Sequence, residues 1–95
     1  MNARRIVGWN VRRIRVERGV TIEELAGEAE VDDSMLARIE RGTVNSSIDL
    51  LERVASVLKV RLVELFVEPL PGAPAPKPLR SGRRPAKAGS ARKRA

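Results

Sequence analysis

The side chains of this sequence that could do chemistry are arginines, carboxylates and hydroxyls. The chain contains 19 Lys or Arg and 12 Asp or Glu, and it has neither His nor Cys. It therefore lacks the commonest general base, the commonest metal ligand and any thiolate nucleophile. No glycine-rich phosphate loop is present, and the carboxylates fall on the faces and at the starts of expected helices. We therefore expect no enzyme, no metal and no cofactor, which leaves a binding surface as the kind of site to expect.

The positive charge of the chain is concentrated at its C-terminal end. The net charge is +7, yet residues 1–68 carry eleven Lys or Arg against twelve Asp or Glu. Residues 69–95 carry eight Lys or Arg, no acid and all six prolines. Such a composition cannot bury enough apolar surface to offset the entropy lost on ordering. We therefore predict one small domain over residues 1–68 and a disordered Pro/Ala/Lys/Arg-rich tail over residues 69–95.

Apolar residues recur at helical spacing along most of residues 1–68. Helices are predicted over 4–18, 48–58 and 62–67, and two shorter ones run from Thr21 to Glu30 and from Asp32 to Gly42. Their apolar faces are expected to carry Val7, Val11, Ile14, Leu25, Ala29, Leu36, Ile39, Ile48, Leu51, Val54, Ala55, Leu58, Leu62, Leu65 and Phe66. No segment has the periodicity of a strand. The sequence thus predicts an all-α fold, a compact five-helix domain.

Residues that begin and end helices occur where the periodicity requires them. Thr21 and Glu24 have the spacing of a capping box. Asp32 and Ser47 are candidate N-caps, and Gly42 suits a left-handed C-cap. The stretch from residue 21 to residue 42 therefore predicts two short helices joined by a tight turn. No apolar run approaches the ~20 residues of a membrane span, and no signal peptide is evident, so we expect a cytoplasmic protein.

The order of these residues resembles the lambda repressor/Cro family of helix-turn-helix domains, also called the XRE family. The resemblance covers residues 7–67 with unbroken spacing. The matching stretches are Val11-Arg12, Ile14-Arg15, Glu17-Arg18-Gly19, Thr21, Glu23-Glu24-Leu25-Ala26, Val31, Leu36, Arg38-Ile39-Glu40-Arg41-Gly42, Asn45, Ser47-Ile48, Leu51, Val54-Ala55, Leu58, Val60 and Glu64-Leu65-Phe66. The resemblance implies a third helix that enters the major groove of double-stranded DNA, and a homodimer that reads a palindromic operator. It implies a transcriptional regulator, either a repressor or an activator, associated with the nucleoid.

The resemblance also implies roles for individual side chains. Those that face base edges would be Asp33, Ser34 and Arg38, and those that face phosphates would be Arg41, Thr43 and Asn45. The dimer interface would include Leu62, Val63 and Phe66, and an internal salt bridge would join Arg15 and Glu40. Arg38 is the best candidate for a specific contact, because a guanidinium can bind O6 and N7 of guanine together.

Four positions depart from the family pattern. Ile22 stands where the family has a Gln that contacts phosphate, Glu30 where the turn has Gly, and Asp32 where a Ser or Thr caps the helix. Asp33 stands where polar or basic side chains meet bases. It could accept a hydrogen bond from cytosine N4 or stabilise the positive start of the helix. We expect a weak or unusual reader, with the loop after Gly42 and the basic tail supplying much of the affinity.

Alternatives to a DNA-reading regulator stay open. The acidic third helix could dock a protein partner, which would make the domain a protein-interaction module. Within the DNA-binding class, antitoxin autorepressors and restriction–modification controllers share this small size. The tail either attracts DNA phosphates through counterion release or only keeps the chain in solution. No second domain that could sense a small-molecule ligand is evident.

Overall fold

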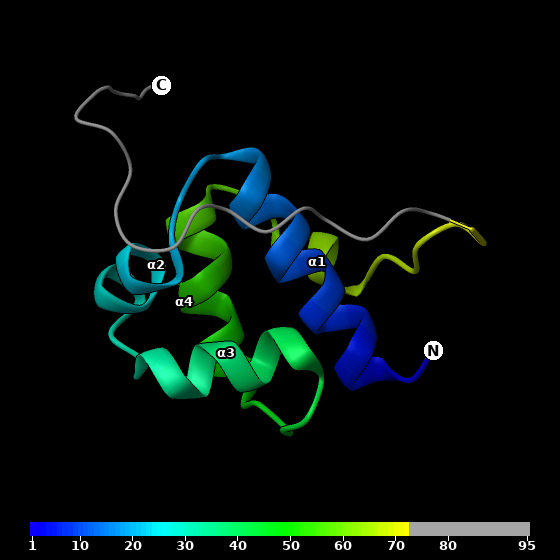
Figure 1. Ribbon diagram of the computed structural model, residues 1–95, viewed down its shortest axis with the longest axis horizontal. Coiled ribbons are helices and arrows are strands. Elements are labelled where there is room, and N and C mark those ends of the chain that lie inside the picture. The colour runs from blue at the N-terminus through cyan, green and yellow to red at the C-terminus, as the bar shows by residue number, and fades with distance from the viewer. Residues whose placement is uncertain (73–95) are drawn as a thin grey trace.

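The computed structural model describes residues 1–72, which form four α-helices and one 3-10 helix without any strand. The elements are α1 (Ala3–Glu17), α2 (Ile22–Ala29), α3 (Asp33–Arg41), α4 (Ile48–Leu58) and η1 (Leu62–Phe66). In Figure 1, α3 lies across the lower end of the molecule, and the start of α1 lies beside its C-terminal end. The prediction of a disordered tail falls mainly on residues 73–95, which lie outside the described residues. None of the helices within residues 1–72 is long and apolar enough to span a membrane.

The fifth predicted helix is a 3-10 helix, so the prediction of a fifth α-helix was wrong. The N–H of Glu64 donates to the carbonyl of Arg61 (2.9 Å), a bond that spans three residues. The carbonyls of Leu65 and Val67 accept from the amide of Asn10, a buried residue of α1. Because the element is five residues long and α1 engages these carbonyls, the segment does not continue into a regular α-helix.

The helix boundaries follow the predicted capping residues, with one exception. Oγ1 of Thr21 accepts from the N–H of Glu24 (3.1 Å), and Oε1 of Glu24 accepts from the N–H of Thr21 (2.9 Å). The hydroxyl of Ser47 accepts from the N–H of Leu50 (3.0 Å). Asp32 has the extended backbone of an N-cap, but its side chain makes no capping hydrogen bond. The carboxylate of Asp32 can therefore stabilise α3 only through its charge near the helix N-terminus.

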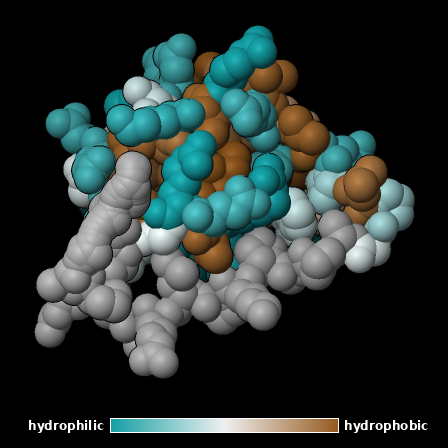
Figure 2. All heavy atoms as spheres, turned by 90° about the horizontal axis from the view of Figure 1, so that it is seen from above, coloured by the Kyte–Doolittle hydropathy of each residue, from teal (hydrophilic) through white to brown (hydrophobic). Residues whose placement is uncertain are grey.

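One aliphatic core joins all five elements. The buried apolar residues are Val7, Val11, Ile14, Leu25, Ala26, Ala29, Leu36, Ile39, Leu51, Val54, Ala55, Leu58 and Leu65. Two residues expected on apolar faces are exposed instead: Ile48 to 58% and Phe66 to 42%. Ile48 is the first residue of α4 and borders a cavity instead of packing against a helix. The face seen in Figure 2 is covered mainly by hydrophilic side chains, with apolar groups visible between them.

A glycine allows α1 and α3 to cross in close contact. A Cβ placed on Gly8 would lie 2.2 Å from the carbonyl oxygen of Ile39 and 2.7 Å from that of Glu40. Those atoms belong to the backbone of α3, so any side chain at position 8 would force the two helices apart. Of all element pairs in the described residues, α1 and α3 share the most extensive contact. The close crossing at Gly8 therefore determines the position of α3 relative to α1.

Candidate nucleic-acid interface

The outward face of α3 is polar and exposed. Leu36 and Ile39 are buried on its inner side, whereas Asp33, Ser34 and Arg38 are exposed. Ser34 and Arg38 are four residues apart and so lie on the same side of the helix, one turn from each other. The three side chains predicted to face bases are thus all exposed, with Ser34 and Arg38 on the same side of α3. An α-helix of this kind fits the width of the DNA major groove.

A buried ion pair joins the inner side of α3 to α1. Nε of Arg15 lies 2.6 Å from Oε2 of Glu40, and Nη2 lies 3.0 Å from Oε1. The two side chains are only 5% and 3% exposed, and Nη1 of Arg15 also donates to the carbonyl of Val20 (2.8 Å). Two parallel bonds between planar groups restrict rotation as well as distance. The pair implied by the resemblance is therefore present, and its position makes it a link that orients α3 on α1.

The turn between α2 and α3 is left-handed at a residue that has a side chain. Glu30 has φ 60° and ψ 50°, and the following N–H, that of Val31, donates to the carbonyl of Ala26 (2.9 Å). A residue other than glycine in this conformation costs roughly 1–2 kcal/mol. Ile22, at the start of α2, packs against the core and offers no polar group to a phosphate. The departures at Glu30 and Ile22 thus leave the helix-turn-helix geometry in place.

The loop after α3 begins with Gly42 in the left-handed conformation, at φ 75°. The N–H and the hydroxyl of Thr43 both lie within hydrogen-bond distance of the carbonyl of Arg38, at 3.1 Å and 3.2 Å. Phosphate oxygens accept hydrogen bonds, so Thr43 would have to release this carbonyl before its hydroxyl could donate to DNA. Arg41 and Asn45 are exposed. Of the three predicted phosphate contacts, Arg41 and Asn45 are therefore the better placed, and Thr43 shapes the loop.

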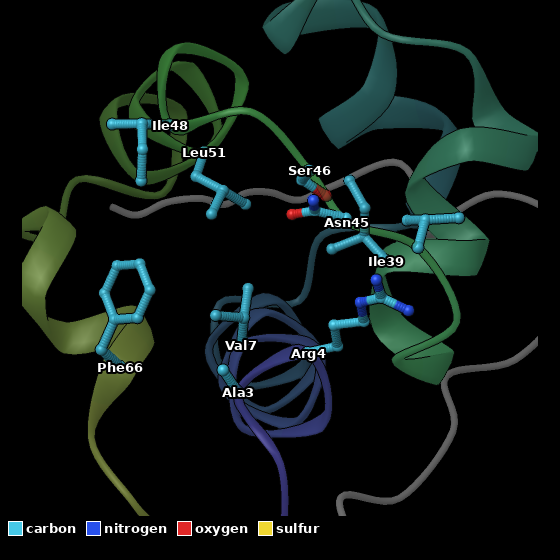
Figure 3. Close-up of a pocket in the computed structure, with 10 residues that line it drawn as sticks. Ala3, Arg4, Val7, Ile39, Asn45, Ser46, Ile48, Leu51 and Phe66 are labelled. Atoms are coloured by element: carbon cyan, nitrogen blue, oxygen red, sulfur yellow. The ribbon is translucent and has the colours of Figure 1, made fainter.

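The residues predicted at the dimer interface do not share one environment. Leu62 is half-buried and packs against the core, whereas Val63 is 54% and Phe66 42% exposed. Phe66 borders a cavity of about 150 Å3 between η1, the start of α1 and the start of α4. Ile48 lies on the opposite side of this cavity in Figure 3. The exposed apolar residues in and beside η1 are thus Ile48, Val63, Phe66 and Val67.

Two structural residues of α1, Gly8 and Asn10, were missed by sequence reasoning. Asn10 is 1% exposed, and its Nδ2 lies 3.0, 3.0 and 2.7 Å from the carbonyl oxygens of Ile6, Leu65 and Val67. The sequence signal for the burial of Asn10 was the position of this polar residue next to Val11, on the apolar stripe of the helix. Gly8 had a similar signal, a glycine inside a helix, whereas the exposure of Ile48 had none. Within residues 1–72, no three acidic side chains gather closely enough to hold a metal ion.

Comparisons with known proteins agree with this geometry. A family model described as helix-turn-helix matches residues 11–65. The HTH-type transcriptional regulator SlrR of Bacillus subtilis is 40% identical over 62 residues, which is 64% of this chain and 41% of SlrR. This chain therefore spans about two-fifths of the length of that relative.

Solved structures give the same result. The hypothetical transcription factor NHTF from Neisseria has a TM-score of 0.69 at 29% identity, over 72% of this chain and 78% of that one. SinR, a master regulator for biofilm formation solved in complex with DNA, has a TM-score of 0.62 at 39% identity, over 64% and 98% of the two chains. The family model covers more than half of the chain, including all of α2, α3 and α4. The chain therefore belongs to the helix-turn-helix family of lambda repressor/Cro-like, or XRE-type, transcriptional regulators.

Proposed function

We propose that this chain is a sequence-specific DNA-binding regulator of transcription whose α3 reads base edges in the major groove. The observation that carries the proposal is the exposed pair Ser34 and Arg38, one turn apart on a helix held from behind by the buried Arg15–Glu40 pair. A helix that is fixed in orientation can place a guanidinium against O6 and N7 of one guanine. The similarity to SinR, which has been solved in complex with DNA, supports DNA binding by this chain.

Selection of binding sites from random duplex DNA tests this proposal. The full chain should enrich one site, and Arg38→Ala should lose about 1–3 kcal/mol of binding free energy on that site. Its affinity for an unrelated duplex should change far less, because the lost contact is to a base. Lys59→Gln serves as the control, since Lys59 is exposed and follows the C-terminal end of α4. If no site is enriched, the DNA-reading proposal fails and a protein-interaction module becomes the better interpretation.

We also propose that two copies pair beside η1 in order to read a palindromic operator. Ile48, Val63 and Phe66 are each more than two-fifths exposed, and neighbouring exposed apolar side chains of this kind mark interaction surfaces. A two-fold dimer places two copies of α3 on successive turns of the same DNA face. Phe66→Glu should lower the mass measured by light scattering and weaken binding to the full palindrome. Leu70→Glu, at an exposed position after η1, is the control, and an unchanged mass for Phe66→Glu would contradict the dimer.

The basic tail is proposed to add affinity for any DNA sequence. Residues 69–95 carry eight positive charges and no acid, whereas residues 1–68 have a net charge of −1. Positive charges that neutralise phosphates release counterions, which makes binding depend steeply on salt. Deleting residues 70–95 should weaken binding at low salt and flatten the plot of log affinity against log salt concentration. A tail that only keeps the chain in solution would leave this slope unchanged. With DNA as its partner, the protein should co-localise with the nucleoid.

A further inference from the structure

The first turn of α1 places two arginines beside the end of α3. Arg4 and Arg5 are both exposed. A Cβ placed on Gly42 would lie 2.8 Å from Cγ of Arg5 and 2.9 Å from its Cα, so the backbone of α1 touches the residue that ends α3. Arg4 borders the same cavity as Asn45 and extends toward the loop after α3 in Figure 3. Two positions distant in sequence from the helix-turn-helix therefore adjoin its phosphate-facing loop.

These two arginines differ from four others in the domain, whose guanidinium groups have partners within it. Arg13 and Arg15 pair with carboxylates, and Arg18 and Arg53 donate to the carbonyls that end α4 and α2. The guanidinium groups of Arg4 and Arg5 have no ion-pair or hydrogen-bond partner within residues 1–72. No contact within residues 1–72 therefore gives the charge of Arg4 or Arg5 a structural role. Together with Arg41, which immediately precedes Gly42, they concentrate positive charge at one end of α3 in a domain whose net charge is −1.

We propose that Arg4 and Arg5 bind backbone phosphates of the DNA strand that passes the C-terminal end of α3. The proposal rests on the proposed function, since it requires α3 to lie in the major groove. A guanidinium binds a phosphate through two parallel hydrogen bonds, and such contacts position the protein without reading sequence. The start of α2 carries the apolar Ile22 where the family resemblance implies a phosphate contact. In this protein the start of α1 supplies charged contacts at the opposite end of the reading helix.

The test compares two double variants of the full chain that lose the same charge. Arg4→Gln/Arg5→Gln removes the two guanidinium groups but keeps Cγ of residue 5, the side-chain atom that lies next to Gly42. Lys59→Gln/Arg61→Gln removes two exposed charges after the C-terminal end of α4. Fluorescence anisotropy measures the affinity of each for the selected site and for an unrelated duplex over a range of salt concentrations. Circular dichroism and the melting temperature establish that each variant is folded. A third double variant, Arg4→Lys/Arg5→Lys, retains both charges and tests whether charge alone suffices.

The expected result is a loss that is the same for both duplexes and depends on salt. Each lost phosphate contact lowers the slope of log affinity against log salt by about 0.9, so the double variant should lose about 2 per bound chain. Its deficit relative to the wild type should then grow about tenfold as salt falls from about 200 to about 50 mM. The Lys59→Gln/Arg61→Gln control should show a smaller change in slope, and the double lysine variant should recover most of the wild-type slope.

The outcomes separate this inference from the proposed function. If the wild type prefers a selected site but the Arg4→Gln/Arg5→Gln variant matches the Lys59→Gln/Arg61→Gln control, the phosphate contact is overturned and the proposed function stands. A loss confined to the selected site would also overturn it, because phosphate contacts act on all sequences alike. If the wild type prefers no DNA site, both proposals fail together.

Discussion

The two ends of α3 differ in charge and in their surroundings. At the N-terminal end, Asp32 and Asp33 are exposed acids, and neither caps the helix through a side-chain hydrogen bond within residues 1–72. At the C-terminal end, Arg38 and Arg41 are exposed, and the first turn of α1 brings Arg5 against the residue that ends the helix. One helix thus has an acidic N-terminal end and a basic C-terminal end.

This difference shows where helix stability and DNA binding agree and where they conflict. The helix dipole favours acids at the N-terminus and cations at the C-terminus. DNA phosphates favour cations at both ends. The two requirements agree at Arg38 and Arg41, but they conflict at Asp33, whose charge suits the helix and repels phosphate. On the proposed function, the C-terminal half of α3 and its neighbours should contribute more of the domain's own affinity for DNA than the N-terminal half.

The largest effect should follow from breaking the buried link behind the C-terminal half of α3. Glu40→Ala leaves the guanidinium of Arg15 buried without its partner and should lower the free energy of unfolding by about 3–5 kcal/mol. Urea denaturation followed by circular dichroism measures it. Glu17→Ala is the matched control, because its pair with Arg13 is partly exposed, to 58% at Glu17 and 33% at Arg13, and should contribute at most ~1 kcal/mol. Equal losses in the two variants would mean that the buried pair does not anchor α3.

A smaller effect, of opposite sign, should come from the turn before the N-terminal end of α3. Glu30→Gly removes the penalty of a side chain in the left-handed conformation, although it makes the unfolded chain more flexible. We expect a net gain in the free energy of unfolding of about 0.5–1 kcal/mol. Lys59→Gly should give a similar gain, since Lys59 has nearly the same backbone angles, φ 61° and ψ 42°. A loss at Glu30 beside a gain at Lys59 would show that the Glu30 side chain makes a stabilising interaction.

The smallest effect is expected at Asp33 itself. Asp33→Asn removes a charge that is favourable at the helix N-terminus and should cost about 0.3–1 kcal/mol of stability at low salt. The same change should raise affinity for an unrelated duplex, because repulsion from phosphate is removed. Both effects should shrink as salt is added. A change in the selected site instead, with cytosine no longer preferred at one position, would identify Asp33 as a base-reading residue.

Much of the scaffold was predictable because its signals are local. The apolar stripe of α1, the capping box of Thr21 and Glu24 and the left-handed Gly42 each depend on residues within a few positions of one another. Short-range periodicity and capping chemistry therefore located α1 to α4 within about a turn. The helix-turn-helix and the exposed face of α3 follow from these elements.

The remaining features depend on contacts between distant parts of the chain. The 3-10 character of η1 follows from its short length and from its contact with Asn10. The position of Arg5 against Gly42 exists only because the glycine at residue 8 lets α1 approach α3. Ile48 is exposed because no helix covers the start of α4, although its spacing matches that of buried residues. Periodicity indicates which side of a helix is apolar. It does not indicate which part of that side is covered by neighbouring helices.

The buried amide of Asn10 has a consequence for the order in which the chain can complete its fold. Two of its three acceptors, the carbonyls of Leu65 and Val67, lie more than fifty residues further along the chain. Until those residues have left the ribosome, the amide of α1 must stay hydrated or be buried with part of its hydrogen bonding missing, at a cost of about 1–3 kcal/mol. The hydrogen bonding of the native core is therefore complete only after Val67 has emerged. A shortened chain that ends with α4 would contain the whole helix-turn-helix. It would lack the carbonyl groups of Leu65 and Val67, which accept hydrogen bonds from Asn10 of α1.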